Sequence, residues 1–177
     1  RLLAIGALGG LQGAIGWWMV ASGLSGTMLD VASYRLATHL GLAFVILGAI
    51  TWFSLVLGRS DRDLMQARRQ RETGLMWMTT FLLGLAFIQI IFGALVAGID
   101  AGRNYIDWPL MAGGILPPDP FDLAPWWRNF FENDGLVQFV HRMAGYILFA
   151  FGAFVWWRAR ASTSDAVRLG FHFVMGM

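Results

Sequence analysis

The 177-residue sequence contains no cysteine and no lysine, and only 14% of its residues are charged. Without cysteine the chain can form no disulfide, thiolate zinc site or iron–sulfur cluster of its own, which argues against a membrane thiol oxidoreductase. All 13 basic residues are arginines, and the formal net charge is only +2. Because these arginines lie mostly in one loop and at the ends of predicted helices, we expect no nucleic-acid partner.

Apolar residues are abundant instead, at 57% of the chain, with 14 Phe and 9 Trp. A helix crosses the hydrocarbon core of a bilayer with about 20 apolar residues. Four stretches are long enough and apolar on all sides, and a fifth begins near Leu169. The sequence therefore predicts an all-α polytopic membrane protein of the transmembrane four-helix-bundle type, in contact with lipid. The predicted spans are 2–21, 36–57, 75–97 and 136–157, with a partial span at 169–177.

The distribution of arginine predicts the orientation of the spans. Residues 58–74 contain five arginines, so the positive-inside rule assigns this loop to the cytoplasmic or matrix side. The loop 98–135 contains six acidic residues against two arginines and is expected outside, together with the short loop 22–34. The expected location is a bacterial plasma membrane or, alternatively, a mitochondrial inner membrane.

A short internal repeat joins the first and third spans. Gln12 and Gly16 match Gln89 and Gly93, and each of these spans precedes one with a histidine near its outer end. Duplicated helical units are common in membrane proteins. The match suggests two related bundles.

The chain is expected to be an internal piece of a longer protein, because Arg1 directly precedes an apolar run and Met177 lies inside another. Residues 1–57 are then the second half of an N-terminal helical bundle. Residues 75–177 are the first part of a C-terminal bundle, and the Arg-rich loop 58–74 connects the two.

His39 and His141 lie inside predicted spans, where an ionisable side chain is costly and indicates function. Both are expected at a similar depth, roughly 5–10 Å below the outer boundary. No third histidine or thiolate is near enough in sequence to suggest zinc. One imidazole on each of two helices fits axial ligation of haem iron, and the alternative is a pair of hydrogen-bonded interior residues. His172, at the start of the partial span, is interpreted as interfacial.

Each of these two histidines has a polar neighbour on its own helix. Arg35 lies four residues before His39, on the same helix face and nearer the outer surface, where it could hold a haem propionate. Gln138 lies three residues before His141 in a comparable position. Arg142, by contrast, points about 100° away from His141.

The outer loop 98–135 is rich in proline, glycine and aromatic residues, and its prolines exclude a long helix at its centre. Its segment 126–131, Trp-Trp-Arg-Asn-Phe-Phe, is expected to lie in the membrane interface as an anchor. The alternative is a lid over a site at the outer leaflet.

Several strings of residues occur in a characteristic order: LQGAIGWWMV (11–20), YRLATHL (34–40), AGRNYIDWPLM (101–111), PWWRNFFEN (125–133) and VQFVHR (137–142). Together they resemble the haem A synthase family in its mitochondrial and α-proteobacterial form, over essentially the whole chain. The absence of cysteine fits this branch, since another branch carries a cysteine pair in an outer loop. The resemblance implies eight helices in two four-helix bundles, of which this chain would supply the third to sixth helices and the start of the seventh.

The resemblance also implies an oxidoreductase that converts the C8 methyl group of haem O to a formyl group, giving haem A for cytochrome c oxidase. His39 would be an axial ligand in the first bundle, which receives the substrate haem, and His141 in the second, which holds haem b. The other ligands and an acidic catalytic residue would lie outside this chain, which alone is expected to be inactive. Implied partners are haem O synthase and cytochrome oxidase assembly factors, and a homo-oligomer is left open.

Two other functions stay open from the residues alone. A membrane b-type cytochrome that transfers electrons without modifying haem would need the same two histidines. A transporter with histidine proton relays would need acidic residues inside the spans as well, and the four full spans contain none.

Overall fold

The computed structural model describes residues 2–23 and 31–176, and over these residues the chain is helical without a β-strand. Four helices are long and apolar enough to cross a membrane: α1 (Leu2–Gly23), α2 (Ser33–Leu57), α4 (Thr73–Gly98) and α6 (Asp134–Ala159). Their ends lie within three residues of the predicted spans. The predicted class, an all-α polytopic membrane protein, is confirmed.

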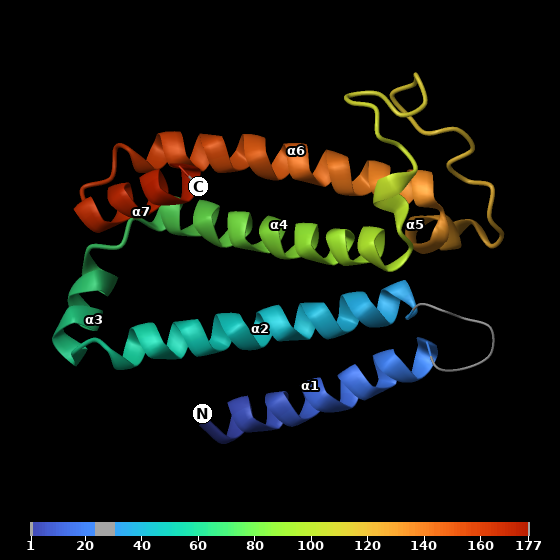
Figure 1. The fold of residues 1–177 in the computed structure, drawn as a ribbon. Helices are drawn as coiled ribbons and strands as arrows, with labels where there is room; N and C mark the ends of the chain where they lie inside the picture. Colours follow the sequence, from blue (N-terminus) through green and yellow to red (C-terminus); the bar gives the residue numbers. More distant parts are fainter. Residues whose placement is uncertain (1, 24–30, 177) are drawn as a thin grey trace.

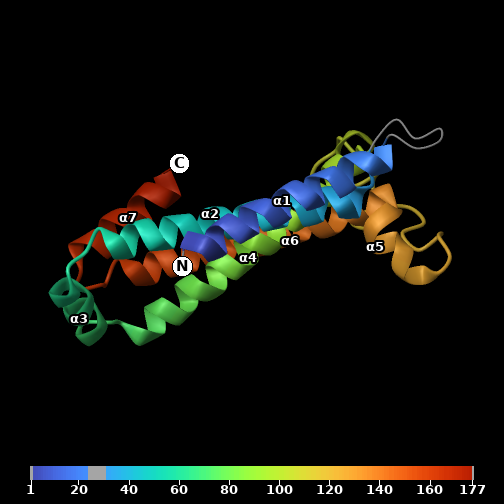
Figure 2. The ribbon, with the colours of Figure 1, turned by 90° about the horizontal axis from the view of Figure 1, so that it is seen from below.

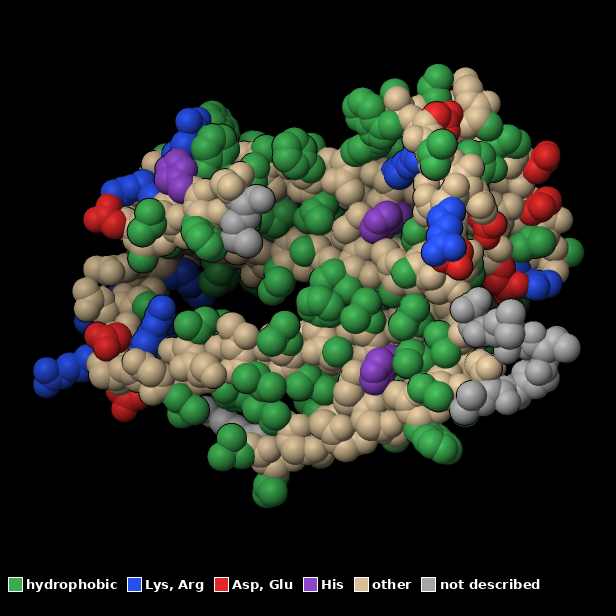
Figure 3. All heavy atoms as spheres, in the orientation of Figure 1, with side chains coloured by type: hydrophobic (Ala, Val, Ile, Leu, Met, Phe, Trp, Pro, Cys, Tyr) green, Lys and Arg blue, Asp and Glu red, His purple; other side chains and the backbone are tan. Residues whose placement is uncertain are grey.

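The four long helices lie side by side in a row, in the order α1, α2, α4, α6, with neighbours antiparallel (Figure 1). Seen at a right angle, the helices overlap in a narrow layer (Figure 2). Charged side chains gather at the two ends of the helices, and hydrophobic side chains lie along the middle (Figure 3). This distribution matches the polar–apolar–polar profile of a bilayer. We call the end that carries residues 99–133 the loop end and the opposite end the arginine end.

The best-packed part of the row lies near the loop end, where α2, α4 and α6 meet. Small residues allow these helices to approach closely. A Cβ atom at Gly98 would lie only 2.7 Å from the Cα atom of Ser33, so α4 touches the backbone of α2 there. The buried core beside this contact consists of Ala37, Ala94, Leu95 and Val137.

Two shorter helices lie at the arginine end, α3 (Asp61–Arg69) and α7 (Asp165–Gly176) (Figure 1). The first lies inside segment 58–74, which the sequence analysis treated only as a loop. Its start is a capping box, in which the Ser60 hydroxyl accepts from the Asp63 backbone N–H and the Asp63 carboxylate accepts from the Ser60 backbone N–H. The pattern Ser-x-x-Asp was therefore a readable signal for this helix.

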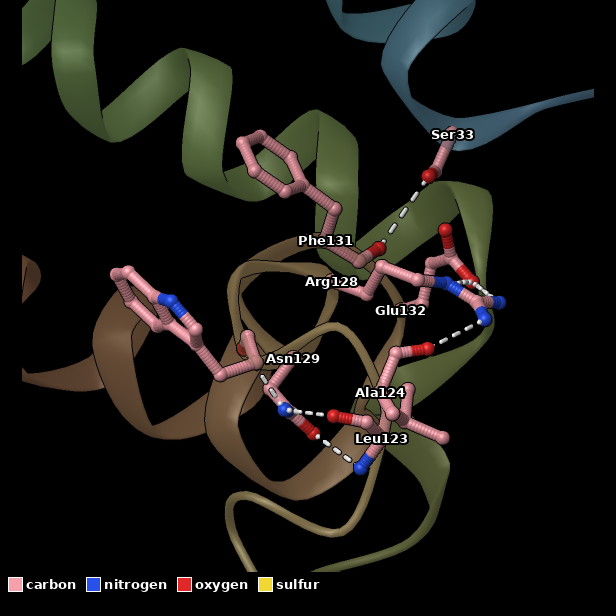
Figure 4. A network of polar contacts seen from close by, with 8 residues as sticks. Ser33, Leu123, Ala124, Arg128, Asn129, Phe131 and Glu132 are labelled. Atoms are coloured by element: carbon pink, nitrogen blue, oxygen red, sulfur yellow. Dashed lines mark hydrogen bonds and ion pairs between the residues drawn. The ribbon is translucent and has the colours of Figure 1, made fainter.

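The loop end is built from short turns, including η1 (Ala101–Arg103), η2 (Trp126–Arg128) and α5 (Asn129–Glu132). The prediction of no long helix at the centre of this loop is confirmed. The fully buried Asn129 side chain organises the turn, since it donates to the carbonyls of Leu123 and Trp126 and accepts from the Leu123 N–H (Figure 4). The predicted short loop 22–34 falls largely on residues 24–30, which lie outside the described residues.

Candidate functional site

Both histidines singled out from the sequence lie near the loop end. His39 is in the second turn of α2 and His141 in the third turn of α6, and both helices start at that end. Both imidazoles are half-buried. Each ring faces the preceding long helix, so His39 contacts α1 and His141 contacts α4.

His39 packs against a glutamine and a glycine of α1. The Gln12 amide nitrogen lies 3.2 Å from Nδ1 and 3.3 Å from Nε2 of the imidazole, and it also donates to the His39 main-chain carbonyl at 3.0 Å. One turn further along α1, a Cβ atom at Gly16 would lie 2.9 Å from the His39 Cε1 atom. Only glycine leaves room for the ring at this position.

His141 has the same two kinds of neighbour on α4. The Gln89 amide nitrogen lies 3.1 Å from Nδ1 and 3.5 Å from Nε2 of the ring, and it donates to the His141 main-chain carbonyl at 3.2 Å. A Cβ atom at Gly93 would lie 3.2 Å from the His141 Cε1 atom. The repeat seen in the sequence is therefore a repeat of histidine sites.

The distances show how each amide meets its ring. The lone pair or N–H of each imidazole nitrogen points outward in the ring plane, in diverging directions. An amide nitrogen at nearly the same distance from both ring nitrogens lies across the ring face instead of along either direction. The amides therefore do not occupy the in-plane lone pair through which an imidazole binds a metal.

The donor chemistry fits haem better than a metal ion held by several side chains. In the part of the chain that the structure describes, no three His, Asp or Glu residues come together as a metal cluster. Each helix pair instead offers one half-buried imidazole in apolar surroundings, which suits an axial ligand of a haem iron. His172 is accounted for differently, because its Nδ1 accepts from the Trp156 indole N–H at 3.0 Å where α7 meets α6.

Arg35 lies one turn nearer the loop end than His39, as expected. It donates to the Trp18 carbonyl of α1 at 2.7 Å, and its guanidinium carbon lies 4.5 Å from the centre of the Trp18 ring. Its Nε atom is buried and has no hydrogen-bond partner among the residues that the structure describes. A cation with an unused donor therefore lies beside the first histidine.

Gln138 differs from Arg35, its expected counterpart, because it is buried and faces the loop. Its amide nitrogen donates to the Tyr105 carbonyl at 2.9 Å. Arg142 donates to that carbonyl too, and to the carbonyls of Asp107 and Leu110 at 3.0 and 3.2 Å. Gln138 and Arg142 thus fasten segment 105–110 onto α6 beside the second histidine.

The contacts of Gln12 and Gln89 with the histidines were not predicted from the sequence. The signal was present as a glutamine followed four residues later by a glycine, in each span before a histidine-bearing span. The repeat did not indicate which residues of the next helix these side chains touch. The role of Arg142 was missed as well, because its partners are main-chain carbonyls of a loop and leave no side-chain pattern.

Comparison with known proteins gives consistent matches over the whole chain. The family model COX15-CtaA, described as cytochrome oxidase assembly protein, matches residues 1–177. A haem A synthase of Dinoroseobacter shibae is 66% identical over 98% of this chain and 45% of its own length. Those of Ruegeria sp. and Paracoccus denitrificans are 64% and 61% identical, over 98% and 95% of this chain and 46% and 44% of their own lengths. The chain thus spans just under half the length of these curated relatives, and no solved structure matches it significantly.

Proposed function

Because the chain belongs to the COX15-CtaA family of cytochrome oxidase assembly proteins, we propose that it is part of a haem A synthase. This enzyme would oxidise the C8 methyl group of haem O to a formyl group, yielding haem A for cytochrome c oxidase. The observation that carries the proposal is the pair of equivalent histidine sites, one in each pair of helices, in a chain at least 61% identical to three proteins of that name.

His39 and His141 would each bind one haem iron as an axial ligand. We assign the substrate haem O to His39 and a resident haem b to His141. The in-plane lone pairs left untouched by the glutamine amides support this role. The bound haem would supply the redox chemistry, while the protein contributes placement, axial ligation and exclusion of water.

Arg35 is proposed to bind a propionate of the haem at His39. Two observations support this role: Arg35 lies one turn nearer the loop end, and its buried Nε has no acceptor among the described residues. Arginine also matches the planar, two-oxygen geometry of a carboxylate. Gln138 is proposed to line the corresponding edge at His141, with its buried and unpartnered Oε1 as the contributing atom.

The protein is an integral membrane protein with bacterial relatives. We propose that segment 58–74 faces the cytoplasm and segment 98–135 the opposite side, since the first carries five arginines and the second six acidic residues. Haem O synthase and cytochrome oxidase assembly factors are the proposed partners.

The direct test is to express the full-length protein in membranes together with a haem O synthase and to identify the extracted haems by chromatography. Haem A that appears only when both proteins are present supports the proposal. Haem O that accumulates unconverted beside haem b would contradict it and would instead identify a membrane b-type cytochrome, which needs the same histidines.

A further inference from the structure

We propose that Gln12 and Gln89 are positioning residues that fix the ring planes of His39 and His141, each together with the glycine one turn later. The inference rests on the proposed function, because it concerns how the two imidazoles are presented to a haem iron. It assigns a task to two glutamines that bind no haem themselves.

Each glutamine amide contacts its histidine at two points. It lies across the ring face, and it also donates to the main-chain carbonyl of the same histidine, at 3.0 Å for Gln12 and 3.2 Å for Gln89. A carbonyl can only accept, so this contact determines that the amide nitrogen and not the oxygen faces the histidine. Because the amide is bonded to the main chain of the histidine's own helix, it moves with that helix and limits rotation of the imidazole ring.

A glycine lies against each imidazole ring, one helical turn after the glutamine. A Cβ atom would lie 2.9 Å from the His39 Cε1 atom at Gly16 and 3.2 Å from the His141 Cε1 atom at Gly93. By contrast, nothing lies within 4 Å of a Cβ atom at Gly13 of α1 or Gly84 of α4, and Gly98 of α4 meets Ser33 instead of a ring. The two glycines are therefore matched to the rings and do not reflect general close packing of small residues.

The same arrangement occurs in both helix pairs, between α1 and α2 and between α4 and α6. The paired residues are separated by 27 positions in the first site and 52 in the second, yet the same three atoms of each histidine are contacted. A chance contact of a polar side chain would not repeat with the same main-chain anchor. The geometry points to one design used for two axial ligands.

The orientation of an imidazole affects its bond to a haem iron. Residues that orient a metal-binding histidine affect metal affinity about 10–100-fold when they are replaced. Around haem, contacts to the axial ligand also change the reduction potential. Gln89 should therefore influence the spectrum, the potential and the retention of the resident haem through His141.

The test uses the full-length protein purified from membranes with its resident haem. Gln89→Met keeps the length of the side chain and removes the amide. We expect it to shift the low-spin electron paramagnetic resonance signal that His141→Ala abolishes, to change the midpoint potential, and to weaken haem retention about tenfold or more. Thr79→Val is the matched control, because the Thr79 hydroxyl only donates to Leu75 of its own helix α4.

Gly93→Ala is the second variant, since its methyl group would lie 3.2 Å from the Cε1 atom of the same ring and crowd it. Both variants must move the signal assigned to His141. A wild-type signal and potential in either variant, with haem bound, would overturn the positioning role and leave the proposed function intact. A wild-type protein without haem, or with haem signals that His141→Ala leaves unchanged, would instead overturn the proposed function.

Discussion

The two helix pairs present the same histidine arrangement in very different surroundings. In α1 the only buried residue is Ser22, and nothing lies within 4 Å of a Cβ atom at Gly6, Gly9, Gly10 or Gly13. The α4–α6 pair is packed along its length, with the rings of Phe81 and Phe151 in edge contact at 5.2 Å towards the arginine end. The second site is also enclosed more tightly, because a Cβ atom at Gly145 would lie 3.1 Å from the Gln89 amide nitrogen.

The surroundings of the two sites at the loop end differ as well. Arg35 beside His39 has an unused donor atom, whereas Arg142 beside His141 is committed to three loop carbonyls. The two sites thus share the contacts made to the imidazole but differ in the residues that surround it. The unused Nε of Arg35 suits the proposed binding of a haem propionate at the first site.

The largest expected effect comes from removing the histidines one at a time in the full-length protein. His141→Ala should abolish the resident haem b, because an alanine offers no axial ligand. His39→Ala should leave haem b at the wild-type ratio to protein and stop haem A formation. The haem-to-protein ratio and extracted haem A measure both.

Equal haem loss in the two histidine variants would remove the proposed division between a substrate site and a cofactor site. Thr38→Val is a suitable control, because the Thr38 hydroxyl beside His39 bonds only to the Tyr34 carbonyl of its own helix.

The connection between the two helix pairs gives the next effect. Gly98→Ala would place a methyl group 2.7 Å from the Cα of Ser33, a backbone atom that cannot step aside. We expect a loss of about 1–3 kcal/mol in the free energy of unfolding, typical of overpacking. Thermal or denaturant unfolding in detergent measures it, with Gly84→Ala as a control because its Cβ meets nothing within 4 Å. A stability loss of the same size at both glycines would refute the proposed backbone contact.

Loosening the loop of the second site should have a more local effect. Arg142→Met removes the donor to the carbonyls of Tyr105, Asp107 and Leu110. Hydrogen bonds from a charged group contribute about 1.5–3 kcal/mol, so amide hydrogens of segment 105–110 should exchange faster while those of α4 stay protected. Hydrogen–deuterium exchange with mass spectrometry tests this prediction. Unchanged protection of segment 105–110 would argue that Arg142 does not anchor it to α6. Arg35→Met, which removes a single bond to Trp18, should leave segment 105–110 as it is.

The smallest expected effect is a pH dependence at the arginine end of the second pair. The Glu72 carboxylate accepts hydrogen bonds from the Ser162 hydroxyl and from the Thr163 backbone N–H. These bonds, the Ser162 bond most of all, hold the pKa of Glu72 below its ordinary value. A lowered folded-state pKa means that the stabilisation is present above the ordinary carboxyl pKa and is lost as the pH falls through the folded-state pKa. The protection factors of residues 160–164, which compare each amide's exchange rate with that of an unstructured amide at the same pH, should therefore be lower at acidic pH than at neutral pH.

Glu72→Gln supplies the control for this pH effect, because an amide does not titrate over that range. In the variant, the protection factors of residues 160–164 should lose their acid-dependent component. An acid-dependent component that persists would assign the effect to another group.

The sequence was a good guide to the spans and to the two histidines. Composition alone predicted α1, α2, α4 and α6 to within three residues at each end, because a membrane span needs a minimum apolar length wherever it lies. Counting along the helices also predicted that His39 and His141 would lie near one end. The helix α3 was not predicted, although its Ser60-x-x-Asp63 cap could have been recognised.

The partners of the histidines could not be derived in the same way. Gln12 and Gln89 reach their histidines only because neighbouring helices are rotated so that these faces meet, and apolar spans without an amphipathic pattern leave that rotation undetermined. The sequence by itself determined which helices are long and apolar enough to span, where they begin and end, and near which end of their helices the histidines lie, since these follow from chain length and transfer energy. Tertiary structure decided which side chain covers each imidazole and which glycine lies against it, because these depend on contacts between residues far apart in the chain.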